Sequence, residues 1–193
     1  MPKASLTTPD LTGAIIDERY ELLHRLGAGT FGVVYKAIDK HAPNDDESRF
    51  CAVKLVTKTG RSPSHISSLR RETAMHGHVS GHDNIITLRE VFDVEDYVVF
   101  VMDLSTGGDL DNFIRAKGPS TDEKTVKTIF LGIVDAIVHM HGLGVYHRDL
   151  KPSNVLVDPT TLQVRLADFG LASSDVHYRR RCGTQSFMPP GEY

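Results

Sequence analysis

The sequence predicts an α+β fold, in which short strands and one helix are followed by a mainly helical part. Two helical patterns frame the prediction: residues 64–79 have helical spacing, and residues 121–141 form a long amphipathic helix. The apolar positions of the long helix are Val126, Ile129, Phe130, Ile133, Val134, Ile137 and Met140. Five apolar or alternating segments read as strands, at 20–26, 33–38, 50–56, 85–92 and 97–104.

A change of character after Gly107 and Gly108 divides the chain. We expect a flexible leader at 1–18, with Pro, Thr and Ser and little periodicity. A smaller, sheet-rich lobe would cover 19–104, and a helical lobe would cover 105–193. Two short strands, at 155–157 and 164–167, are expected inside the second lobe.

Composition excludes several classes of protein. The 193 residues are 40% hydrophobic and 24% charged, the balance of a globular domain. A net charge of −3 offers no basic field for nucleic acid or anionic lipid. No 18 apolar residues run together, and the first ten residues do not resemble a signal peptide. The chain contains only two cysteines and no disulfide framework, which suits a reducing compartment. Taken together, these observations predict an intracellular protein, cytoplasmic or nuclear, that binds neither nucleic acid nor membrane.

A glycine-rich segment follows the first strand. Gly27, Gly29 and Gly32 allow backbone N–H groups to approach phosphate oxygens that a Cβ would hold away. The same spacing marks dinucleotide-binding proteins, but there it opens a helix, whereas here residues 33–37 continue as a strand. No Gly-Lys-Ser/Thr follows, so a Walker-type NTPase is also excluded.

Two segments in the second half of the chain are the most specific indication of its chemistry. His147-Arg148-Asp149-Leu150-Lys151-Pro152-Ser153-Asn154 precedes Asp168-Phe169-Gly170. Phosphoryl transfer needs a carboxylate facing the attacking hydroxyl and oxygen ligands for magnesium. Asp149 suits the first role, and Asn154 and Asp168 suit the second. Chance does not produce both segments in this order and separation.

With these motifs the chain resembles the protein kinase family from about residue 20 to 192. The resemblance implies a two-lobed kinase fold with a five-stranded antiparallel sheet and one main helix in the first lobe. It also implies that Lys54 contacts the ATP phosphates and pairs with Glu72, which lies 18 residues further along. Asp149 would be the catalytic base. Lys151 is typical of serine/threonine kinases, and its ammonium would steady the transferring phosphoryl group.

The same resemblance predicts the ATP site. Met102 falls at the gatekeeper position, Asp103 and Ser105 belong to the hinge segment that faces adenine, and Asp109 contacts the ribose. The remaining predicted ATP-binding residues are those of the glycine-rich segment and those that sandwich the base: Leu26, Gly27, Ala28, Gly29, Gly32, Val34, Ala52 and Leu156. ATP and Mg²⁺ are the expected cofactors, and a protein carrying Ser or Thr is the expected partner.

The segment after Asp168 offers four candidate phosphorylation sites, at Ser173, Ser174, Tyr178 and Thr184. Thr184 is expected to pack against Asp149 and Lys151 instead of accepting phosphate. The run of arginines at 179–181 has two open readings, a partner for a loop phosphate or a solvated basic turn.

Histidines do not predict a zinc site, because no cysteine or carboxylate completes either histidine cluster at ligand spacing. His76 lies four residues after Glu72, where the family usually places an aliphatic residue. Together with residues 71–75, it makes the chain similar to a fungal group of kinases that regulate nutrient response and meiosis.

The chain departs from the family pattern near its end. The family's Ala-Pro-Glu segment corresponds here to residues 188–192, where Gly191 displaces its glutamate to Glu192. The sequence ends at Tyr193, before the later helices that the family has in the helical lobe. Apolar residues of the helix at 121–141 would then be exposed and favour association with other proteins. Two hypotheses remain: a working serine/threonine kinase, or a catalytically weak or inactive module that binds nucleotide or protein.

Overall fold

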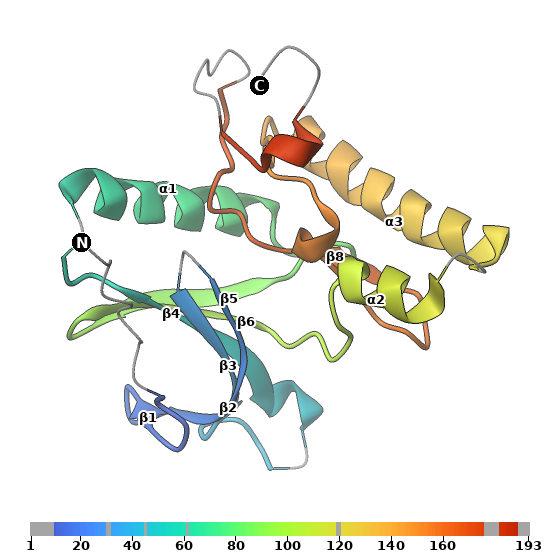
Figure 1. Ribbon diagram of the computed structural model, residues 1–193. Helices are drawn as coiled ribbons and strands as arrows, with labels where there is room; N and C mark the ends of the chain where they lie inside the picture. Colours follow the sequence, from blue (N-terminus) through green and yellow to red (C-terminus); the bar gives the residue numbers. More distant parts are fainter. Residues whose placement is uncertain are drawn as a thin grey trace, which may run out of the picture. The chain divides into compact units, whose positions relative to one another are not determined.

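The computed structural model describes residues 10–29, 32–44, 46–60, 62–118, 121–175 and 182–188. The chain forms two compact units (Figure 1). Unit 1 comprises residues 1–60 and 89–104, and unit 2 comprises residues 61–88 and 105–193. The two units are described separately below.

Unit 1 is built on an antiparallel sheet with strand order β1-β2-β3-β4-β6-β5. The strands are β1 (Ile15–Ile16), β2 (Tyr20–Gly29), β3 (Gly32–Asp39), β4 (Phe50–Thr57), β5 (Leu88–Val94) and β6 (Tyr97–Asp103). A short 3-10 helix, η1 (Glu47–Arg49), precedes β4 and is capped by Asp46. β3 alternates half-buried and buried residues along its length, the pattern of a strand with one face against a core.

The sheet has six strands in place of the five that the sequence predicted. The additional strand is β1, where Ile15 and Ile16 pair with Glu21 and Tyr20 of β2. Apolar side chains of this segment pack on the core of unit 1. Their burial stabilises the segment on the sheet, although its sequence shows no strand periodicity. Residues 10–16 of the predicted flexible leader therefore contact the sheet, whereas residues 1–9 lie outside the described part of the chain.

A cluster of buried residues forms the core of unit 1: Tyr20, Leu22, Val33, Tyr35, Ala37, Cys51, Val53, Leu55, Val99 and Val101. Beside it, Arg19 donates to both carboxylate oxygens of Asp39, at 2.8 and 2.6 Å, and to Glu90 at 3.0 Å. The Arg19 hydrogen bonds hold the pKa of Asp39 below its ordinary value. This network ties β2, β3 and β5 together at one end of the sheet.

Unit 2 contains the helices α1 (Pro63–Val79), α2 (Leu110–Lys117) and α3 (Glu123–Gly142). It also contains η3 (Pro152–Asn154), the hairpin of β7 (Val155–Val157) and β8 (Val164–Leu166), and η4 (Gln185–Phe187). Asp109 and Asp122 cap α2 and α3, each accepting a hydrogen bond from a backbone N–H in the first turn. Among the described residues, no helix is long and apolar enough to cross a membrane.

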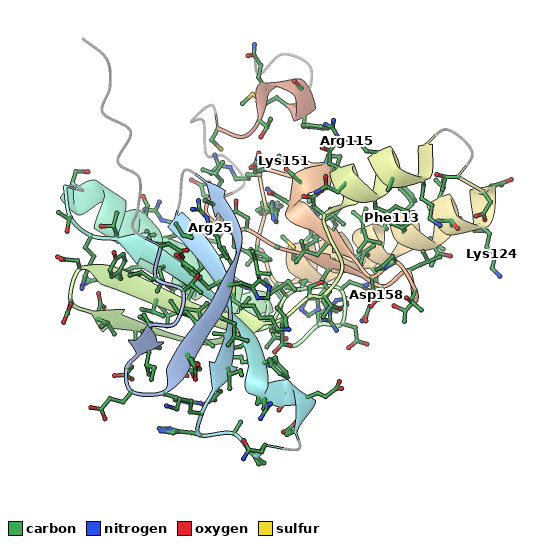
Figure 2. The ribbon with its side chains drawn as sticks, turned by 60° about the horizontal axis from the view of Figure 1, so that its bottom comes forward. Arg25, Phe113, Arg115, Lys124, Lys151 and Asp158 are labelled. Carbon is green, nitrogen blue, oxygen red and sulfur yellow. The ribbon has the colours of Figure 1, made fainter. Side chains whose placement is uncertain are left out.

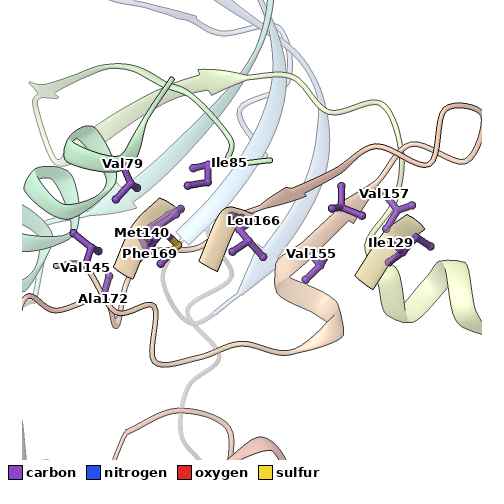
Figure 3. Close-up of a cluster of buried hydrophobic side chains, with 12 residues drawn as sticks. Val79, Ile85, Ile129, Met140, Val145, Val155, Val157, Leu166, Phe169 and Ala172 are labelled. Carbon is purple, nitrogen blue, oxygen red and sulfur yellow. The ribbon is translucent and has the colours of Figure 1, made fainter. Parts of the chain in front are cut away.

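The core of unit 2 joins α3 to the β7–β8 hairpin (Figure 3). Its buried members are Val79, Ile85, Ile129, Ala136, Met140, Val145, Val155, Val157, Val164, Leu166, Phe169 and Ala172. Phe113 of α2 packs against the same cluster (Figure 2). Four large apolar residues of α3 are more than half exposed: Val126, Phe130, Leu131 and Val138. The exposure predicted for this helix is therefore present in the structure.

Candidate active site

The centre of the candidate site is the carboxylate of Asp149, whose residue is only 8% exposed. Its Oδ1 accepts hydrogen bonds from the backbone N and the Oγ1 of Thr184, at 2.9 and 2.8 Å. Its Oδ2 accepts from Lys151 Nζ at 2.6 Å and from Asn154 Nδ2 at 3.1 Å. Lys151, which precedes η3 (Figure 2), also donates to Thr184 Oγ1 at 2.9 Å. The structure thus brings together the three predicted catalytic residues and Thr184.

These contacts set the charge of Asp149. Burial alone would raise its pKa, but hydrogen bonds from Lys151 and Thr184 and the positive charge of Lys151 outweigh burial and lower the pKa below its ordinary value. The carboxylate is therefore ionised at neutral pH. Its orientation is set by four donors on three side chains and one backbone N–H.

His147 links the backbone at Asp149 to the backbone at Ala167. Its ring is buried, Nε2 lies 3.0 Å from the carbonyl oxygen of Ala167, and Nδ1 accepts a hydrogen bond from the N–H of Asp149. These contacts assign the proton to Nε2, since a carbonyl oxygen can only accept. Burial lowers the pKa of His147, so the ring is neutral. The neutral imidazole thereby links the segment before Asp168 to the backbone of Asp149.

Two residues of this region adopt a backbone conformation that is unusual for side chains with a Cβ. Arg148 has a φ of 67° and Asp168 a φ of 62°. Such residues are costly and persist where the surroundings fix them, most often at functional sites. Gly183 also has a positive φ, of 105°, and a Cβ there would lie 2.7 Å from the carbonyl oxygen of Arg148. The glycine lets Thr184 approach Asp149, while Arg148 donates to Cys182 Sγ.

Asn154 and Asp168 present oxygen donors that fit Mg²⁺, which prefers carboxylate and amide oxygens. Asn154 directs its amide nitrogen at Asp149, to the backbone oxygen at 2.9 Å and to Oδ2, so its amide oxygen points to the other side. The N–H of Ala167 donates to the carbonyl oxygen of Asn154 at 2.9 Å, which ties together the segments that carry these two candidate ligands. The Oδ1 atom of Asp168 is shielded from solvent.

The rings around Phe169 form a buried cluster, in which His76 is stacked on Phe169 and His147 is tilted against it. The His76 ring lies 4.4 Å from that of Phe169, and the His147 ring lies 5.2 Å from it on centroid distances. His76 Nε2 is also 2.6 Å from the carbonyl oxygen of Ile86. A Cβ built at Gly170 would lie 3.6 Å from Oε2 of Glu72, so the predicted partner of Lys54 lies beside the Asp168-Phe169-Gly170 segment.

Unit 1 carries most of the predicted ATP-binding residues. The β2–β3 pair joins Gly27 to Val34, Ala28 to Val33 and Gly29 to Gly32, with an irregularity between Arg25 and Gly27 that leaves Leu26 exposed. Next in the sheet, β4 pairs Ala52 with Met102, Lys54 with Phe100 and Cys51 with Asp103. Lys54 is largely buried, with its ammonium 5.4 Å from the centre of the Phe100 ring.

The other predicted ATP-binding residues lie in unit 2: Glu72, Ser105, Asp109 and Leu156. Asp109 forms an isolated bridge with Leu156, so these two predicted contacts of ribose and base are neighbours. Both carboxylate oxygens of Asp109 accept hydrogen bonds from Asn112, at 2.8 and 3.0 Å. Lys54 belongs to unit 1, whereas Ser105 and Glu72 belong to unit 2, and the pairing of Lys54 with Glu72 stays a prediction.

The candidate phosphorylation sites differ in accessibility. Ser173 is buried, at 5% exposure, while Ser174 is exposed. Tyr178 and the arginines at 179–181 lie outside the described residues. The hydroxyl of Thr184 is held by Asp149 and Lys151, in the arrangement expected from the sequence.

Comparison with known proteins gives the family. The protein kinase domain family matches residues 20–192. The chain is 36% identical over 182 residues to a negative regulator of sexual conjugation and meiosis from Schizosaccharomyces pombe, covering 93% of this chain and 38% of that protein. It is 34% identical over 180 residues to myosin light chain kinase A of Dictyostelium discoideum, covering 91% of this chain and 59% of that protein.

The chain therefore has a protein kinase domain over residues 20–192 and belongs to the protein kinase family. Serine/threonine-protein kinase cds1 of Schizosaccharomyces pombe is a further relative, 30% identical over 184 residues, covering 90% of this chain and 38% of that protein. The chain thus spans between about two fifths and three fifths of the length of these relatives. The expected likeness to fungal meiosis-regulating kinases is confirmed. The family as a whole uses ATP and Mg²⁺.

Proposed function

We propose that this chain is an ATP-dependent serine/threonine protein kinase domain, which transfers the γ-phosphate of Mg-ATP to hydroxyl groups of proteins. The observation that carries the proposal is the buried, ionised Asp149 carboxylate, held by Lys151, Asn154 and Thr184. Its support in sequence is the match to the family over residues 20–192 and the likeness to named serine/threonine kinases.

In the proposed reaction, the hydroxyl oxygen of a substrate Ser or Thr attacks the γ-phosphorus in line. A bond forms between that oxygen and phosphorus, and the bond from phosphorus to the β–γ bridging oxygen breaks, so that ADP leaves. Asp149 receives the hydroxyl proton. The carboxylate is already ionised, but four donors occupy its two oxygens, so one of these hydrogen bonds has to open before Asp149 accepts the proton.

Lys151 has two tasks in this scheme. Its ammonium lies 2.6 Å from Asp149 Oδ2, where it keeps the carboxylate charged. It would also stabilise negative charge that develops on the transferring phosphoryl group. Thr184 holds both residues through one hydroxyl, and so it would fix the distance between them.

The nucleotide would be bound by the residues that the likeness to the family indicates. We propose that the backbone of residues 27–32 and Lys54 contact the phosphates, and that Val34, Ala52 and Leu156 enclose the base. Asn154 and Asp168 would hold Mg²⁺, which neutralises phosphate charge when bound. Glu72 would pair with Lys54 and keep that ammonium directed at the phosphates.

A second candidate function is a kinase-like module that binds nucleotide or protein without phosphate transfer. The exposed apolar residues of α3 favour it, because contiguous apolar surface commonly marks a site of association. In this case the chain would bind ATP but transfer nothing.

The deciding experiment measures phosphate transfer from Mg-ATP to a basic protein by the purified chain. Asp149→Asn is the blank, because it keeps the shape of the side chain and removes the base. Transfer above that blank supports the kinase. Nucleotide binding with no transfer, by protein shown to be folded, supports the binding module, and the absence of both would contradict both proposals.

A further inference from the structure

Arg89 makes two hydrogen bonds that join three separate stretches of unit 1. It lies near the start of β5, which is an edge strand of the sheet. Its Nε donates to Asp103 Oδ1 at 2.7 Å, and its Nη1 donates to the carbonyl oxygen of Ser48 at 2.7 Å. Asp103 ends β6, and Ser48 belongs to η1, just before β4. One guanidinium therefore fixes the end of one strand against the start of another.

The position of Asp103 gives this contact its importance. Asp103 is the last residue of β6 and pairs with Cys51 of β4, and the chain leaves unit 1 after the next residue, Leu104. Arg89 is itself the first residue of unit 1 after the chain returns from unit 2. The ion pair thus links two points at which the chain crosses the boundary of unit 1. The planar guanidinium holds its donors in a fixed fork, so it sets direction as well as distance.

We propose that Arg89 is a positioning residue for adenine recognition. The inference rests on the proposed function, in which the backbone of residues 103–105 faces the adenine of ATP. An adenine edge offers one donor and one acceptor to an extended backbone, and such hydrogen bonds weaken steeply when their geometry is lost. By holding the Asp103 side chain and the η1 backbone together, Arg89 fixes the direction in which the backbone after Asp103 runs.

The contribution of Arg89 is local. The side chains of Arg89 and Asp103 are 28% and 36% exposed, and ion pairs of this exposure add little to global stability. Loss of Arg89 would therefore leave the unit folded while the adenine-facing backbone samples more orientations. Binding of the base would weaken, and the phosphate-transfer chemistry at Asp149 would not change.

The test compares Arg89→Ala and Arg89→Lys with a matched control, Lys58→Ala. Lys58 also lies in unit 1, its side chain is also 28% exposed, and it pairs with Asp93 at 3.1 Å. It differs from Arg89 in lying by the β5–β6 turn, where its N–H donates to the carbonyl oxygen of Asp96. The dissociation constant of Mg-ATP is measured by calorimetry, and KM and kcat are measured where transfer occurs. Hydrogen exchange reports on the backbone amides of residues 101–104, and melting temperatures report on folding.

Arg89→Ala should raise the dissociation constant and the KM for ATP by about three- to tenfold, with kcat unchanged within about twofold. Amide exchange at residues 101–104 should become faster. Arg89→Lys should give an intermediate effect, because an ammonium can keep the charge but not both directed bonds. It also serves as the test variant if Arg89→Ala does not fold. Lys58→Ala should match the wild type in ATP binding and in exchange at these amides.

Two unfavourable results are distinguishable. If the wild type binds ATP and the Arg89 variants bind it as well as Lys58→Ala does, the inference is wrong and the proposed function stands. If the wild type binds no ATP, the proposed function is wrong and the inference falls with it.

Discussion

The two units of the molecule present their predicted site residues in opposite ways. In unit 2, the Asp149 carboxylate is buried and held by four hydrogen-bond donors. In unit 1, Leu26, Gly27 and Ala28 of the glycine-rich segment are exposed, and a Cβ at Gly27 would meet nothing within 4 Å. One region is fixed before substrate arrives, and the other offers open backbone.

This difference follows from what each region has to recognise. A catalytic carboxylate has to be aimed at one proton, so its orientation must be set in advance. Phosphates are large, charged and rich in acceptors, and backbone N–H groups can bind them wherever no side chain intervenes. The contrast predicts that substitutions in unit 2 disturb chemistry and folding, whereas substitutions in the glycine-rich segment disturb nucleotide affinity.

The largest effect is expected at the carboxylate itself. Asp149→Asn should lower kcat by about 10²–10⁴-fold, the usual contribution of a general base. ATP affinity should stay near that of the wild type, because the amide keeps the size of the side chain. The melting temperature should fall, because the amide nitrogen cannot accept the hydrogen bonds that one carboxylate oxygen accepts. Steady-state kinetics and calorimetry measure these quantities, and a variant that kept its kcat would contradict the assignment of Asp149 as base.

A pair of glycine substitutions tests the contrast directly. A Cβ at Gly107 would lie 1.8 Å from the carbonyl oxygen of Val157, so Gly107→Ala should lower the free energy of unfolding by about 3 kcal/mol. Gly27→Ala meets open space and should change it by less than about 0.5 kcal/mol, while ATP binding weakens. Urea titrations and ATP calorimetry provide the two measurements. Equal destabilisation by both substitutions would break the comparison.

Thr184 tests whether the fixed geometry matters for rate. Thr184→Val removes the hydroxyl that contacts Asp149 and Lys151 but keeps the branched shape and the backbone N–H bond. Loss of hydrogen bonds to two charged groups should lower kcat by about tenfold or more. Thr184→Ser keeps the hydroxyl and should recover most of the rate. If Thr184→Val kept its rate while Thr184→Ser lost it, the methyl group and not the hydroxyl would carry the effect.

The smallest effect is a pH dependence that arises from His147. Burial lowers its pKa below the ordinary 6.5, so below pH 6.5 His147 binds a proton more readily in the unfolded chain than in the folded chain. This contribution to stability is present above pH 6.5 and is lost as pH falls, by at most about 1.4 kcal/mol per pH unit for one proton.

His147→Gln provides the control for this dependence, because its amide can still donate to the carbonyl oxygen of Ala167 but does not titrate. Denaturant midpoints measured from pH 7.5 to 5.5 should fall less steeply in this variant than in the wild type. Parallel slopes would show that His147 takes up its proton equally well in the folded state.

The sequence predicted those elements whose signal is local. The strand expected at 155–157 is β7 itself, and the helices expected at 64–79 and 121–141 are α1 and α3 to within a residue or two. α2 was not predicted, because eight residues give too short a window for a 3.6-residue period. Asp109, which caps this helix, was singled out only for its predicted contact with ribose, and that contact stays a prediction.

Errors arose where contacts between distant residues decide the structure. The strand expected at 85–92 begins later, at Leu88, since Ile85 and Ile86 bond instead to Leu166 of β8, far along the chain. β1 was not predicted, because a strand of two residues, Ile15 and Ile16, has no periodicity of its own and forms only by pairing with β2. The Arg89–Asp103 contact carries no sequence signal at all, since the two residues lie on different strands.

The motif residues at Asp149, Lys151 and Asn154 could be assembled from the sequence because they fall within one short loop. The Thr184 contact, 35 residues from Asp149, was expected only through the likeness to the family. The contacts among Asp149, Lys151 and Asn154 could thus be predicted from their spacing in the sequence. The contact between Thr184 and Asp149 depends on how the chain folds.

The two cysteines of the chain differ in a way that has a practical consequence. Cys51 lies in the core of unit 1, where burial raises the pKa of its thiol to about 11, so hardly any thiolate forms there at neutral pH. Cys182 is half-buried and lies two residues before Thr184. A maleimide dye added to the native protein should therefore attach at Cys182 alone. The chain, without any engineered cysteine, carries its own attachment point for a fluorescent reporter two residues from Thr184, which contacts the Asp149 carboxylate.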